Sequence, residues 1–157
     1  MDKKQIRREL IERASEQLRL AQEALASTSS YKHDPDMKQE GKYDTRSIEA
    51  GQLAGAQARR VEELKLELQL LEDIPERDFG PGEEVAIGAL ALIALGEVQR
   101  WYYISPAAGG TMVQTPEGTV LVISVFSPIG HEAVGLAAGD SFAVQVQGQE
   151  RTYRIMA

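Results

Sequence analysis

Apolar residues in the first half of the chain recur every three or four positions, which is the spacing of one face of an α-helix. One stripe runs through Ile6, Leu10, Ala14, Leu18, Ala21 and Leu25, and a second through Ala50, Ala54, Gln57, Val61, Leu64, Leu68 and Leu71. Both stripes are narrow, as in a coiled-coil seam. They predict two long helices packed as an antiparallel hairpin, and the second helix would be roughly 45 Å long.

A polar segment separates the two stripes and contains Pro35 and Gly41, which both interrupt a helix. The tip of the predicted hairpin therefore falls at about residues 30–43. Because the hairpin is long and the remaining chain is short, we expect the second domain to leave part of the hairpin's polar outer faces uncovered.

The second half of the chain is rich in valine and in turn residues, which favours β-structure. Strand candidates are residues 85–95, 101–104, 119–126, 142–146 and 153–155. One short helix fits after Pro128, with Ser127 as its N-cap. The fold class is therefore α+β, with an antiparallel coiled-coil hairpin in residues 1–75, a linker in 76–82 and an antiparallel sheet domain with one short helix in 83–157.

Composition excludes several functions. The 157 residues include no cysteine and two histidines, which rules out disulfides, zinc ribbons and three-histidine metal sites. The net charge is -7, of which residues 1–75 carry -2 and residues 76–157 carry -5. This acidity argues against free-standing DNA binding through a basic surface.

The longest apolar run, residues 85–95, is too short for a membrane span of about 20 residues. The sequence starts with charged residues and shows no apolar signal segment. We therefore expect a cytoplasmic protein without membrane association.

Two segments together resemble the Gre family of bacterial transcript cleavage factors, which includes GreA and GreB. The first segment contains Ile123-Ser124, then Ser127-Pro128-Ile129-Gly130-His131, then Gly139-Asp140 and Tyr153-Arg154-Ile155. The second is Glu40-Gly41-Lys42-Tyr43-Asp44, which is similar to the tyrosine-bearing stretch after the family's coiled-coil tip. His131 stands where the family usually has arginine.

The resemblance implies an FKBP-like C-terminal domain that docks at the rim of the RNA polymerase secondary channel, and a coiled coil that enters this channel. It implies no enzyme activity of the chain itself, because the polymerase active site would cut the RNA, and contact with nascent RNA would be indirect. In the family, two tip acids help to hold a catalytic magnesium ion. A hard cation of this kind prefers carboxylate oxygens.

The tip of this chain offers Asp34, Asp36 and Glu40, but it departs from the family's Asp-x-x-Glu pattern. Counting back from Tyr43 places Asp36 on the family's aspartate and Gln39 on its glutamate. Gln39 is a poor magnesium ligand, while the adjacent Glu40 offers a carboxylate. Two versions stay open: Asp36 and Glu40 support cleavage with a magnesium ion shared with the polymerase, or the chain regulates transcription by occupying the channel without cleavage.

Other residues are candidates for partner contact. They are Asp34, Gln39, Tyr43 and Arg46 at the tip, and Ser127, Pro128, Ile129, Gly130 and His131 in the second half. A function of another class, an FKBP-like peptidyl-prolyl isomerase or chaperone, would need an apolar pocket lined by aromatic side chains. A structural coiled-coil dimer is a third possibility, because narrow seams can also pair between chains.

Overall fold

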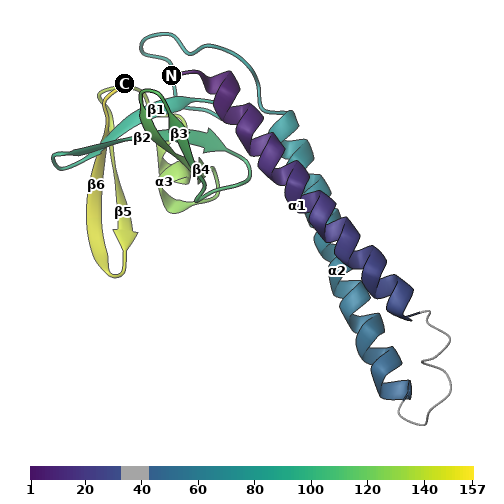
Figure 1. The fold of residues 1–157 in the computed structure, drawn as a ribbon. Helices are drawn as coiled ribbons and strands as arrows, with labels where there is room; N and C mark the ends of the chain where they lie inside the picture. Colours follow the sequence, from purple (N-terminus) through teal and green to yellow (C-terminus); the bar gives the residue numbers. More distant parts are fainter. Residues whose placement is uncertain (33–42) are drawn as a thin grey trace. The chain divides into compact units, whose positions relative to one another are not determined.

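The structure is a computed structural model that describes residues 1–32 and 43–157. Its elements are α1 (Lys3–Lys32), α2 (Tyr43–Glu72), β1 (Leu90–Leu95), β2 (Val98–Ser105), β3 (Met112–Thr115), β4 (Gly118–Ser124), α3 (Pro128–Ala133), β5 (Ser141–Val146) and β6 (Gln149–Ile155) (Figure 1). The predicted fold class, a long helix pair followed by a mostly antiparallel sheet with one short helix, is confirmed.

Contacts between residues divide the chain into two compact units. One unit is Ile11–Gln69, and the other joins Met1–Leu10 with Leu70–Ala157. The first turns of α1 and the last turn of α2 therefore belong to the unit that contains the sheet. The domain limits at residues 75 and 83 stay predictions.

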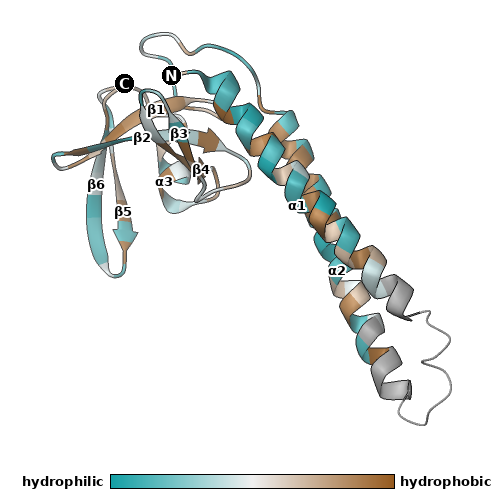
Figure 2. Cartoon of the chain, viewed as in Figure 1, coloured by the Kyte–Doolittle hydropathy of each residue, from teal (hydrophilic) through white to brown (hydrophobic). Residues whose placement is uncertain are grey.

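The helices α1 and α2 lie side by side in the unit of Ile11–Gln69 (Figure 1). Ala14, Val61 and Leu64 are buried on the predicted stripes, and Leu18 is half-buried. Figure 2 shows that much of both helices is hydrophilic outside this seam. The two stripes thus pair within one chain.

The sheet has six strands in the order β3-β4-β2-β1-β6-β5. Neighbouring strands are antiparallel except β2 and β4, which run parallel with Trp101 opposite Val120 and Ser105 opposite Ser124. This pair departs from the predicted antiparallel sheet. It arises because the chain reverses after β2 into the short β3, and the β3–β4 hairpin then brings β4 back in the direction of β2.

The strand predicted over residues 85–95 begins only at Leu90. Gly88 adopts a φ of 89°, and a Cβ built on it would lie 3.0 Å from the carbonyl oxygen of Pro75. The chain therefore turns at Gly88 and presses against the segment that follows α2. β3 was not predicted, because its four residues contain a single buried position, Val113.

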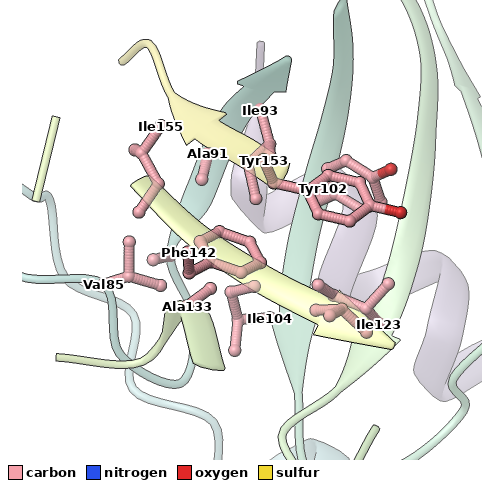
Figure 3. Close-up of a cluster of buried hydrophobic side chains, with 12 residues drawn as sticks. Val85, Ala91, Ile93, Tyr102, Ile104, Ile123, Ala133, Phe142, Tyr153 and Ile155 are labelled. Atoms are coloured by element: carbon pink, nitrogen blue, oxygen red, sulfur yellow. The ribbon is translucent and has the colours of Figure 1, made fainter. Parts of the chain in front are cut away.

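One face of the sheet carries the main hydrophobic core, which α3 completes by contributing Ala133 (Figure 3). The rings of Phe142 and Tyr153 stack there at 5.4 Å between their centroids. These side chains point to one side of their strands because residues alternate between the two faces of a sheet.

The opposite face of the sheet is also buried, around Tyr103, Val113, Val120 and Val122. Four residues in or directly after the helix ends of the same unit are equally buried: Ile6, Leu10, Leu71 and Ile74. A Cβ on Gly88 would lie 3.2 Å from Cγ2 of Ile74, which places this helix end against the sheet domain. The helix ends therefore cover the part of the second face that β2, β3 and β4 form, while the alternate residues of β5 and β6 are exposed.

Candidate functional site

The turn between β4 and α3 holds the motif residues in a defined hydrogen-bond network. Ser127 is the N-cap of α3, and its Oγ accepts from the backbone N–H of Gly130 at 3.1 Å. The same hydroxyl donates to the carbonyl oxygen of Ser124 at 2.7 Å. Pro128 occupies the first turn of α3, where its missing N–H costs nothing. The predicted cap and helix start are confirmed.

Gly130 fits this turn because it has no side chain. A Cβ built on Gly130 would lie 2.0 Å from the carbonyl oxygen of Ser124 and 2.8 Å from its carbonyl carbon. A Cβ on Gly109 would lie 3.1 Å from the amide nitrogen of Ser124, so two glycines press on the same residue. The glycine of the motif thus lets the first turn of α3 lie directly on the end of β4.

Removing the Ser127 hydroxyl is expected to lower the free energy of unfolding by about 1–2 kcal/mol, because Ser127→Ala loses one cap and one further hydrogen bond. Urea unfolding would measure this change. Ser141→Ala is a matched control, since Ser141 is exposed at the start of β5, and it should change stability by less than about 0.5 kcal/mol. Equal losses in the two variants would contradict a capping role.

The turn also presents an exposed apolar side chain. Phe126 is 83% exposed, although it was predicted to end a strand, because β4 stops at Ser124 and the chain turns away from the sheet. Pro128 and His131 are exposed beside it, and Val134 is partly exposed. We call Phe126, Pro128, His131 and Val134 the α3 surface. Ile129 is half-buried and packs against the core.

Sequence reasoning did not identify Phe126 as a contact residue. The strand pattern of residues 119–126 assigned it to the sheet, where an aromatic residue is common. One sequence feature could have shown that Phe126 lies outside the strand, namely its position directly before the Ser-Pro pair that starts a helix. A large aromatic side chain left in water is the unusual feature of this turn.

The other motif residues have structural positions. The side chain of Asp140 accepts from the backbone N–H of Ala137 at 2.9 Å, and Gly139 adopts a φ of 96° in the same turn. Tyr153 and Ile155 are buried in the core. These residues shape the sheet domain. Within Ser127–His131, Pro128 and His131 are the exposed residues, and Gly130 is buried.

The predicted tip residues Asp34, Asp36, Gln39 and Glu40 lie outside the described residues. Tyr43 and Arg46 fall in the first turns of α2. Within residues 1–32 and 43–157, three or more His, Cys, Asp or Glu side chains nowhere gather into a group that could hold a metal ion. The magnesium assignment therefore stays a prediction from the sequence.

The aromatic residues that a prolyl isomerase pocket would need are mostly in the core. Tyr102, Tyr103, Phe142 and Tyr153 are buried. Burial raises the pKa of Tyr103 to about 12, so its phenol stays protonated at neutral pH.

Among the helices of residues 1–32 and 43–157, we find none with the length and apolar character of a membrane span.

Comparison with known proteins gives the following relatives. No family model matches the chain. Among solved structures, Gfh1 of Thermus aquaticus covers 94% of this chain and 92% of its own at 19% identity and a TM-score of 0.41. GreA/GreB of Nitrosomonas europaea covers 61% of this chain and 75% of its own at 21% identity and a TM-score of 0.36.

A closer sequence relationship comes from the transcription elongation factor GreA of Methylococcus capsulatus. It is 30% identical to this chain over 125 residues, which are 78% of this chain and 72% of that protein. Since the identity extends over most of both proteins, this chain belongs to the Gre family of transcription elongation factors.

Proposed function

We propose that this chain binds RNA polymerase and regulates transcript elongation through the secondary channel of that enzyme. The observation that carries the proposal is the 30% identity to GreA across most of both chains. In this proposal the helix pair α1–α2 enters the channel, and the α3 surface contacts the polymerase outside it. The chain is an accessory factor, and any RNA cleavage takes place in the polymerase active site.

The charge distribution suits such a role. The hairpin half carries a net charge of only -2 and the sheet half -5, so neither half offers the basic surface of a free-standing nucleic-acid binder. A protein that reaches RNA inside its partner needs no such surface. Its contact with the transcript is then indirect and depends on the polymerase.

The α3 surface is suited to a protein contact because it combines an exposed aromatic ring with a rigid base. Interface energy is concentrated in a few side chains, and aromatic residues are frequent among them. The cap at Ser127 and the close approach of Gly130 fix the turn that carries Phe126. A rigid anchor loses little conformational entropy when it binds.

Phe126→Ala is expected to weaken the affinity for core RNA polymerase about tenfold, because it removes the largest exposed apolar group of the α3 surface. Titration of labelled protein with polymerase, followed by fluorescence anisotropy, would measure the change. Val98→Ala is the control, since Val98 is 64% exposed at the start of β2 and lies outside this surface.

The outcomes separate two parts of the proposal. If the unmodified chain does not associate with polymerase at micromolar concentration, polymerase binding is wrong. If the chain binds and Phe126→Ala binds equally well, the docking role of the α3 surface is wrong while polymerase binding stands.

The tip supports two versions of the mechanism. Asp36 and Glu40 provide two carboxylates, a donor set that fits a magnesium ion shared with the polymerase. Such an ion stabilises the attacking and leaving oxygens in phosphodiester hydrolysis. Gln39, at the position of the family's glutamate, favours the second version, in which the hairpin occupies the channel without stimulating cleavage.

A further inference from the structure

A polar cavity lies at the start of α1, against the segment of residues 75–78 and the phenol of Tyr103. Its volume is about 220 Å³, and all of its lining residues belong to the unit that contains the sheet. Four of the lining side chains are cationic: Lys3, Lys4, Arg7 and Arg77. Three carboxylates line it as well: Asp2, Glu76 and Asp78.

Two of these carboxylates are already occupied by the fold. Oδ1 of Asp2 accepts from the backbone N–H of Lys4 at 2.9 Å, so it caps α1 and satisfies the helix end. Oε1 of Glu76 accepts from Nη1 of Arg7 at 2.8 Å. The inference therefore rests on the cationic side chains rather than on the helix N-terminus.

Cationic groups remain beside the cavity after these pairs are formed. Arg77 pairs with Glu83 at 2.8 Å, and Nζ of Lys3 donates to the carbonyl oxygen of Arg77 and lies 4.7 Å from the centroid of the Phe79 ring. Neither Lys3 nor Lys4 forms a side-chain ion pair with any described residue, so their charges are not neutralised by a carboxylate in direct contact. Burial lowers the pKa of Lys3, and the charge of Arg77 acts in the same direction although Asp78 opposes it. An anion in the cavity would offset both effects.

Arg7 contributes a hydrogen-bond donor that the fold does not use. Its two terminal nitrogens bond to Glu76 and to the carbonyl oxygen of Glu72. Its Nε–H is buried and has no acceptor among the described residues. A buried donor without an acceptor destabilises the fold, so a small shift of the Arg7 side chain that lets an anion's oxygen reach Nε would be stabilising.

We propose that this cavity binds a small oxyanion of the phosphate class, either inorganic phosphate or one phosphate group of a larger molecule such as pyrophosphate. Arginine and lysine are the side chains that pair best with phosphate oxygens. A volume of about 220 Å³ lies below the range of roughly 300–1,000 Å³ typical for drug-sized ligands. The cavity therefore accommodates a phosphate group. This site is independent of the proposed polymerase contact.

Thermal unfolding of the full chain tests the proposal. Sodium phosphate should raise the melting temperature progressively with concentration, because a ligand that binds only the folded state stabilises it by mass action. Sodium chloride at equal ionic strength is the control for screening, and sodium acetate is the control for a carboxylate ligand. Pyrophosphate, measured in parallel, distinguishes a single phosphate from a linked pair by its affinity.

Two variants locate the binding. Lys4→Gln should weaken phosphate binding about fivefold by calorimetric titration, since Lys4 lines the cavity and is exposed, so the change should not disturb the fold. Lys65→Gln, in the unit of Ile11–Gln69, should bind phosphate like the unmodified chain. Arg7→Lys keeps the charge but removes the Nε–H, and it should weaken binding further.

Several results would overturn the proposal. If chloride raises the melting temperature as much as phosphate does, the effect is screening. If acetate acts as strongly as phosphate, the site takes carboxylates. If Lys4→Gln and Lys65→Gln bind phosphate equally well, the ion does not bind in this cavity.

Discussion

Gly130→Ala is expected to lower the free energy of unfolding of the sheet-containing unit by about 3 kcal/mol, the largest stability change among these predictions. The added Cβ would lie 2.0 Å from the carbonyl oxygen of Ser124, a distance that no rotamer can relieve because a methyl group has none. The start of α3 would have to move away from β4. Urea unfolding followed by circular dichroism would measure the loss.

The control for this prediction is a glycine in an open helical position. A Cβ on Gly55 of α2 would meet only the end of the Arg59 side chain, at 3.8 Å. Alanine is favoured over glycine inside a helix by about 1 kcal/mol, so Gly55→Ala should be neutral or stabilising. Opposite signs for the two Gly→Ala changes are expected, and a Gly130→Ala protein as stable as the unmodified chain would contradict the close approach.

Gln39→Glu is expected to raise magnesium-dependent transcript cleavage in backtracked polymerase complexes about tenfold or more. This change supplies a second carboxylate in the Asp-x-x-Glu spacing with Asp36, and a single preorganised electrostatic group contributes about 10²–10³ to a rate in favourable sites. Gel analysis of shortened RNA over time, at several magnesium concentrations, would measure the rates. Gln52→Glu is the control, because it adds the same charge at an exposed position of α2.

The double variant Asp36→Ala/Glu40→Ala completes the experiment. If the unmodified chain already stimulates cleavage and the double variant abolishes it, the tip carboxylates support cleavage, and occupancy without cleavage is wrong. If the unmodified chain and Gln39→Glu are both inactive while they bind polymerase, the magnesium function of the tip is wrong. Cleavage that survives in the double variant would also contradict it.

The helical part of the fold was predictable because its seam is local. Residues such as Leu10, Ala14 and Leu64 repeat at helical spacing, and the structure buries all three. The cap at Ser127 was predictable for the same reason, since its partner Gly130 lies three residues away.

Features that depend on distant residues were not predictable. The strand predicted over residues 85–95 begins only at Leu90, because the chain turns at Gly88 where it presses on Pro75, a contact between segments with no shared pattern. The parallel pairing of β2 with β4 depends on how β3 folds back, and β3 itself has only one buried residue. Short strands of this kind carry almost no periodic signal.

The candidate site also has features that the sequence predicted and features that it did not. The motif Ser127–Gly130 was identified from its residues, and the structure gives it a local reason in the cap and the close approach to Ser124. The exposure of Phe126 was missed, because exposure depends on where β4 ends and the turn begins. The roles assigned to Asp36 and Glu40 rest on the sequence alone and stay predictions.

The division of the chain into two compact units has a consequence for how the chain folds. Residues 11–69 are an insertion between two parts of one unit, with Ile6 and Leu10 before it and Leu71 and Ile74 after it. Closing so long a loop costs entropy that grows with its length, and distant contacts slow folding. Pairing of α1 with α2 brings the two ends of the insertion together through contacts that propagate from one turn to the next. Formation of the helical hairpin thus also brings together the residues that cover part of the second face of the sheet.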